Sequence, residues 1–102
     1  MKVMNLITEV QIQPIKPRDG LIAFASFVLN NELYLSSVGI HSKLNDFGYR
    51  LTYPTKLVGA REINIFHPIT KELGAAIEEA MIKKLNEVMR GVREWQITTI
   101  KK

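Results

Sequence analysis

The apolar pattern of this chain changes its period once, at residues 64–70, which read NIFHPIT. Before this junction apolar residues recur at every second position, as at Leu51 and Tyr53, which is the period of a half-buried strand. After it they recur at every third or fourth position, which is the period of a helix. His67 precedes a proline, which disfavours helical backbone, and Thr70 can cap the helix that follows. The pattern predicts a sheet followed by one helix, with the His67 ring capping or packing at the junction.

Five strands are expected before the junction, at residues 6–15, 21–29, 32–40, 48–53 and 62–66. The turn signals between the first three are residues 16–20 (KPRDG) and Asn30-Asn31, since glycine and asparagine tolerate positive φ. Residues 41–47 and 54–61 are expected to be loops. Along the third strand the apolar parity slips at Ser36-Ser37, which predicts either a β-bulge or a bend where the strand changes partner.

The second strand is apolar on both of its faces, so both faces need cover. One face is expected to pack on the helix, and a partner subunit is the simplest cover for the other. On the helix, Ile82 and Met89 fall outside the expected core stripe and widen the apolar arc. The predicted dimer interface therefore consists of Phe24, Phe27, Ile82 and Met89.

The helix is predicted over residues 71–90, with its core stripe at Leu73, Ile77, Ala80, Met81, Leu85 and Val88. Gly91 is a plausible helix terminator, and residues 95–100 are rich in strand formers, which predicts a short edge strand in this sheet or across a dimer. The expected fold is α+β, a twisted antiparallel sheet of about five strands with one long C-terminal helix. Residues 1–102 form one domain: a sheet at 1–69, a helix at 70–90 and a basic tail at 91–102.

Composition excludes several classes of protein. The chain has 102 residues, 46% hydrophobic content and no cysteine, so a single domain without disulfides or thiolate metal sites is expected. No apolar run approaches the roughly 18 residues of a membrane span, and we expect a soluble, cytoplasmic protein. His41 and His67 are the only histidines, and neither lies in a metal-binding spacing. Without a convergent polar cluster or a glycine-rich phosphate loop, we expect no enzyme, cofactor, metal or small-molecule substrate.

The net charge of +4 lies in the middle loops and the C-terminal tail, because the helix carries nearly balanced charges. Such a distribution favours polyanionic partners. The candidate nucleic-acid contacts are Lys43, Arg50, Lys56 and Arg61 in the loops and Lys71 at the helix N-terminus. Tyr49 and Tyr53 neighbour these charges and could stack on bases, although their alternate spacing favours core or interface packing.

Four segments together resemble the stage V sporulation protein G (SpoVG, septation protein) family of small bacterial proteins. They are ITEVQIQPI at residues 7–15, AFASFVL at 23–29, GYRLTYPTK at 48–56 and NIFHPI at 64–69. The resemblance covers residues 2 to about 89, and Lys56, His67 and Pro68 match the family motifs directly. The chain departs from them at Gln11, Gln13 and Pro14, where the family carries arginines, at Leu57, and at Ser36-Ser37, where the family has a His-Asp pair.

This resemblance implies a homodimer that binds nucleic acid and regulates gene expression. We therefore expect a regulatory protein that binds DNA or RNA through phosphate contacts from its basic loops. The alternative is a non-enzymatic structural or protein-interaction module that binds no nucleic acid. The first hypothesis predicts that function depends on Lys56 and Arg61, and the second that it depends on Phe24.

Overall fold

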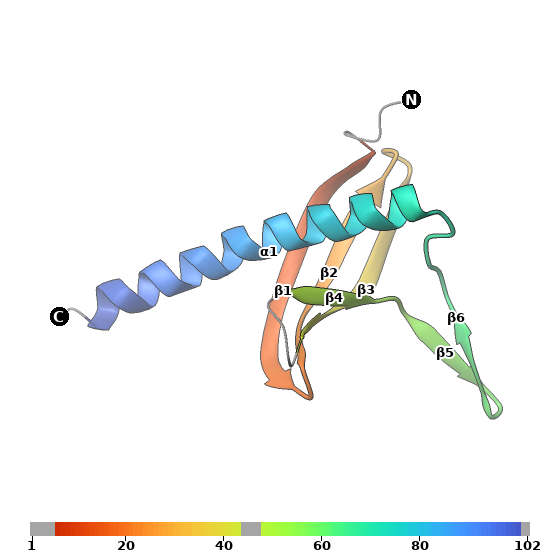
Figure 1. Ribbon diagram of the computed structural model, residues 1–102, viewed down its shortest axis with the longest axis horizontal. Helices are drawn as coiled ribbons and strands as arrows, with labels where there is room; N and C mark the ends of the chain where they lie inside the picture. Colours follow the sequence, from red (N-terminus) through yellow and green to blue (C-terminus); the bar gives the residue numbers. More distant parts are fainter. Residues whose placement is uncertain (1–5, 44–47, 101–102) are drawn as a thin grey trace.

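The computed structural model describes residues 6–43 and 48–100, and for residues 92–100 it describes the backbone alone. The fold is α+β, as predicted: a four-stranded antiparallel sheet, a separate two-stranded hairpin and one long C-terminal helix (Figure 1). The elements are β1 (Ile7–Arg18), β2 (Leu21–Leu29), β3 (Leu33–Ser42), β4 (Tyr49–Thr52), β5 (Thr55–Val58), β6 (Arg61–Asn64) and α1 (Lys71–Ile100).

The larger sheet is a meander in which each strand pairs with the next, in the order β1-β2-β3-β4. Asn30 and Asn31 both have positive φ, at 53° and 56°, which confirms the predicted tight turn between β2 and β3. The turn between β1 and β2 is shorter than predicted. It consists of Asp19 and Gly20 alone, and β1 runs to Arg18. β1 contains prolines and is an edge strand, the position in a sheet to which proline is largely confined.

The expected irregularity at Ser36-Ser37 is a β-bulge. Ala25 pairs with Val38 and Phe27 pairs with Leu35, so two residues of β3 stand opposite the single residue Ser26 of β2. Ser37 has a φ of 66°, the left-handed conformation of a residue inserted into a strand. The bulge restores the alternation after it, and Val38 and Ile40 thereby point to the helix side of the sheet.

The core lies between one face of the larger sheet and α1. Its buried members are Ala23, Ala25, Phe27, Val38 and Ile40 of the sheet and Ile77, Met81 and Leu85 of the helix. The three helical residues are spaced by four, which confirms the predicted core stripe. The opposite face of the sheet, which we call the open face, is not covered by α1 (Figure 1).

Helix α1 begins where the sequence predicts but ends about ten residues later. Thr70 Oγ1 accepts a hydrogen bond from the Leu73 N–H at 3.2 Å, which confirms the predicted N-terminal cap. The predicted stop at Gly91 and the predicted strand at residues 95–100 are wrong, because the helix continues to Ile100. Adding a residue to an existing helix forms a hydrogen bond without a new nucleation cost, so residues with weak helix propensity can extend it.

The prediction of a loop at residues 54–61 is also wrong in part. Residues 55–58 pair with residues 61–64 as a hairpin, β5–β6, which turns at Gly59 and Ala60. This hairpin forms a sheet of its own and projects to one side of the larger sheet (Figure 1). With it, the described part of the chain has six strands, against the five expected. In the described part of the chain, no helix has both the length and the apolar character needed to cross a membrane.

Candidate nucleic-acid interface

The β5–β6 hairpin, residues 55–64, carries two of the five candidate basic residues, and we refer to it as the arm. Lys56 lies on β5 and Arg61 on β6, and both are exposed. Lys56 pairs with Ile63, and Arg61 pairs with Val58. Paired residues of an antiparallel ladder project to the same side, and side chains alternate along each strand. Lys56, Val58, Arg61 and Ile63 therefore share one side of the arm, the basic face.

The opposite side of the arm, the Leu57 face, carries Thr55, Leu57, Glu62 and Asn64. Glu62 does not lie beside the two cations, because its Oε1 accepts a hydrogen bond from Thr55 Oγ1 at 2.7 Å on this face. The arm thus separates its charges: two cations with two aliphatic side chains on one face, and one hydrogen-bonded carboxylate on the other. Alternation along two short strands is sufficient to produce this separation.

The remaining basic candidates lie elsewhere. Lys43 and Arg50 lie at the β3–β4 connection, where the Lys43 N–H donates to the Gly48 carbonyl at 3.2 Å and Arg50 pairs with His41. Lys71 is the first residue of α1. All three are exposed, but they lie on different elements from the arm (Figure 1). The five candidate basic residues therefore do not form one cluster. Residues 101–102, the lysines that end the basic tail, lie outside the described part of the chain.

The two tyrosines near these charges are packing residues. Tyr49 and Tyr53 are both half-buried and pack against the core. The Tyr53 ring meets the Phe66 ring edge to face, with the centroids 5.9 Å apart. Burial, and secondarily the charge of Glu78, raise the pKa of the Tyr53 hydroxyl above its ordinary value of 10.0. Of the two interpretations of these residues, packing agrees with their surroundings.

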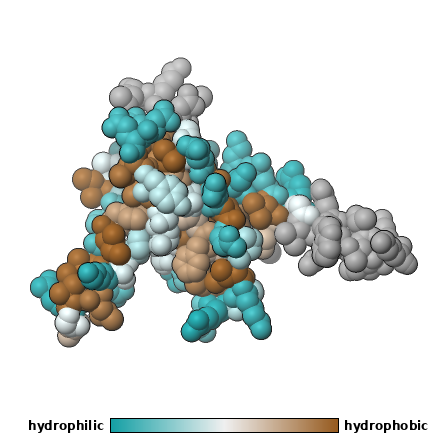
Figure 2. Space-filling view, turned by 180° about the vertical axis from the view of Figure 1, so that it is seen from behind, coloured by the Kyte–Doolittle hydropathy of each residue, from teal (hydrophilic) through white to brown (hydrophobic). Residues whose placement is uncertain are grey.

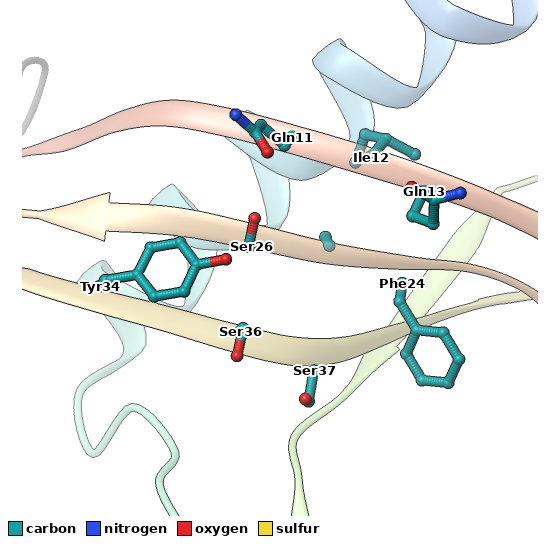
Figure 3. A pocket seen from close by; sticks show the side chains of 9 residues that line it. Gln11, Ile12, Gln13, Phe24, Ser26, Tyr34, Ser36 and Ser37 are labelled. Carbon is teal, nitrogen blue, oxygen red and sulfur yellow. The ribbon is translucent and has the colours of Figure 1, made fainter.

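A recess on the open face is a feature that sequence reasoning missed. It has a volume of about 300 Å³ and is lined by side chains of β1, β2 and β3: Gln11, Ile12, Gln13, Phe24, Ala25, Ser26, Tyr34, Ser36 and Ser37. In Figure 3 the glutamines project from β1 and the Tyr34 ring is directed toward Ser26. No lining residue carries a charge. The sequence signal that pointed toward it was the parity slip at the serines of the bulge.

His41 occupies the other end of the open face, between Leu21 of β2 and Arg50 of β4. Its Nε2 lies 3.0 Å from Thr52 Oγ1, while its Nδ1 is buried without a hydrogen-bond partner. Burial, and secondarily the positive charge of Arg50, lower the pKa of His41 below its ordinary value of 6.5. His67, in contrast, is exposed at the junction, where its ring Nδ1–H donates to the Pro68 carbonyl at 3.1 Å.

The four predicted interface residues divide into three groups. Phe24 lies on the open face and is 40% exposed, so its side chain is available to a partner. Phe27 is fully buried beneath α1, and its prediction as an interface residue is wrong, because residues three apart on a strand face opposite sides. Ile82 and Met89 are half-buried, and the prediction that Met89 lies outside the core stripe is wrong, because Met89 packs against the core.

Within residues 6–43 and 48–100, apart from the side chains of 92–100, no group of three or more acidic or histidine side chains is placed to hold a metal ion. Comparisons of the chain with protein-family models, characterised proteins and solved structures gave no match. The residues that the fold brings together are therefore the basis for a functional proposal. They are the basic face of the arm and the uncharged recess of the open face.

Proposed function

We propose that this protein binds nucleic acid as a homodimer and acts as a regulator of gene expression in the cytoplasm, without catalysis. The observation that carries the proposal is the basic face of the arm. Lys56 and Arg61 project from the same side of an exposed two-stranded ribbon, beside Val58 and Ile63. Cations supply phosphate contacts, while small aliphatic groups can contact sugars and base edges.

Duplex DNA is the form of nucleic acid that suits this shape. The major groove of B-DNA is wide enough for a two-stranded ribbon, whereas the major groove of an RNA helix is deep and too narrow for side-chain access. The arm projects from the larger sheet and is therefore free to enter a groove (Figure 1). Lys43, Arg50 and Lys71 are exposed on other elements and would add phosphate contacts along the backbone.

Charge reversal on the arm tests the proposal. In Lys56→Glu/Arg61→Glu, fluorescence anisotropy with a labelled duplex should show weaker binding. The plot of log affinity against log salt should become shallower by about 3.6, since the two chains of the dimer together lose four phosphate contacts and each contributes about 0.9. Lys83→Glu/Arg90→Glu makes the same charge change on exposed positions of α1 and serves as the matched control. Equal losses in the two double variants, or no binding by the parent protein at low salt, would overturn the proposal.

The second candidate is a protein-interaction module without nucleic-acid binding. Exposed aliphatic side chains on the arm favour it: Leu57 is 71% exposed, Val58 53% and Ile63 45%. Exposed apolar groups gathered in one place often mark a site of protein contact. If Lys56→Glu/Arg61→Glu leaves function intact and Phe24→Asp abolishes it, this second candidate is the correct one.

A further inference from the structure

We propose that the arm of one chain seats its Leu57 face in the open-face recess of a second copy, and that the second copy returns the same contact. This inference rests on the homodimer of the proposed function and names its interface. It assigns a role to two surfaces that otherwise have none, the Leu57 face of the arm and the recess between Phe24 and Tyr34.

The first observation is that the arm lacks support of its own. A two-stranded hairpin without a third strand or a packed face is at best marginally stable in water. The arm has two strands of four residues, and its aliphatic side chains face solvent. Exposure continues into the connection to α1, where Ile65 is 61% and Ile69 87% exposed. In Figure 2 hydrophobic residues gather on the arm, away from the centre of the molecule. A contact over Leu57, the most exposed of the three aliphatic residues of the arm, would stabilise it.

The second observation is the chemistry of the recess. Tyr34 is 65% exposed and Phe24 40%, although they lie on neighbouring strands in the middle of a sheet. These rings offer apolar contact surface, while the amides of Gln11 and Gln13 and the hydroxyls of the bulge offer hydrogen bonds. Large, half-exposed aromatic side chains beside uncharged hydrogen-bonding groups are typical of protein interfaces. A volume of about 300 Å³ admits a leucine side chain.

The two surfaces match in charge. On the Leu57 face the single carboxylate, that of Glu62, already accepts a hydrogen bond from Thr55, and its neighbours are uncharged. The recess contains no anion to repel this carboxylate, and the amide groups of Gln11 and Gln13 and the serine hydroxyls can donate hydrogen bonds to it. The basic face of the arm, in contrast, would place Lys56 and Arg61 against uncharged groups, at the cost of desolvating both.

A second copy is the occupant that these observations favour. Both surfaces belong to one chain, yet the arm does not lie over its own open face (Figures 1 and 2). When one chain carries two complementary surfaces, a two-fold axis satisfies both at once and closes the assembly. The arrangement also leaves the basic face of each arm exposed, as the proposed nucleic-acid binding requires.

Cysteine cross-linking tests the inference directly, because the chain has no cysteine of its own. One chain would carry Thr55→Cys, on the Leu57 face, and a differently tagged chain would carry Ser37→Cys, at the recess. After mixing and treatment with a short bismaleimide, the doubly tagged species should be the main product. Lys56→Cys, one residue away on the basic face, replaces Thr55→Cys in the control mixture and should cross-link to Ser37→Cys in much lower yield.

Light scattering distinguishes a failure of the inference from a failure of the proposed function. The parent protein should show twice the 11.6 kDa of one chain, and Leu57→Ser should shift it toward the monomer with unchanged circular dichroism. A monomeric parent overturns both the homodimer and this interface. A dimer in which Thr55→Cys links only to itself, or in which Leu57→Ser has no effect, overturns the interface alone. Neither result depends on nucleic acid, so the proposed binding is tested separately.

Discussion

His41 is a residue whose surroundings change its chemistry. It lies beside Arg50 on the open face, and its Nδ1 is buried without a partner while its Nε2 meets Thr52 Oγ1. The neighbouring Gly39 leaves the space that this contact occupies, since a Cβ there would lie 2.6 Å from Thr52 Oγ1. Burial and Arg50 both disfavour the imidazolium, so the folded state holds the pKa of His41 below its ordinary value of 6.5.

A stability loss at mildly acidic pH follows from this depressed pKa. Below pH 6.5 the unfolded chain protonates His41 more readily than the folded chain does, so the free energy of unfolding falls as the pH decreases through this range. His41→Gln keeps a partner for Thr52 but does not titrate. Its melting temperature should therefore fall less than that of the parent between about pH 7.5 and about pH 5. Calorimetry at the two pH values measures the difference.

The other histidine provides the control for this experiment. His67 is exposed at the junction, and His67→Gln removes one imidazole without touching the open face. The parent and His67→Gln should show the same difference in melting temperature between the two pH values, and His41→Gln a smaller one. A fall in His41→Gln as large as in the parent would show that the burial of His41 does not control stability in this range.

Single residues with local chemistry were the most predictable from the sequence. The Thr70 cap, the Asn30-Asn31 turn and the irregularity at Ser36-Ser37 each depend on neighbours within a few positions, and the structure confirms all three. The recess could not be found in the same way. It combines Gln11, Ser26 and Ser36, which are far apart in sequence, and their meeting depends on the register between strands.

At the scale of elements, β6 overlaps the strand predicted at residues 62–66, but β5 escaped prediction because it is short and breaks the expected alternation. Leu57 and Val58 are adjacent aliphatic residues on opposite faces, and both are exposed. The sequence therefore lacks the alternation of apolar and polar residues that marks a strand with one buried face. The end of α1 was missed for a different reason. Residues 95–100 favour strands intrinsically, but they follow a helix that is already formed, and local preference is a weak determinant in that position.

Gly91 lies inside α1, so its replacement should stabilise the protein. A Cβ at position 91 meets nothing within 4 Å, and the residue is exposed on the helix. Gly91→Ala removes the entropic cost of an interior glycine and should raise the free energy of unfolding by up to about 1 kcal/mol. Urea denaturation measures this change. If Gly91 instead ended the helix with positive φ, the alanine would destabilise the protein.

A matched variant separates this effect from a general preference for alanine. Gly39→Ala is the same substitution in the sheet, where the new Cβ would press on Thr52 Oγ1 and lie 3.2 Å from a Leu21 methyl. It should lower the free energy of unfolding by about 1–3 kcal/mol, as overpacking does. Opposite signs for the two glycines are therefore expected from their surroundings.

At the scale of the whole molecule, the fold consists of two parts: a packed body, made of the larger sheet and α1, and the arm, which packs on neither. The larger sheet and α1 share one buried core, whereas the arm forms its own sheet and exposes its aliphatic residues. If each arm is stabilised by the other copy, the two basic faces are held in one assembly. Nucleic-acid binding then involves both arms together, and the second arm binds as an intramolecular event.

This coupling predicts that loss of the dimer halves the salt dependence of DNA binding. With Lys56 and Arg61 from two arms, log affinity should fall against log salt with a slope near −3.6 from the arms alone, and near −1.8 from one arm. Leu57→Ser removes no charge, so any change in slope reports assembly. Leu33→Ser, at another exposed leucine outside the arm and the recess, should keep the parent slope. A steep slope retained by monomeric Leu57→Ser would show instead that a single chain supplies all the phosphate contacts.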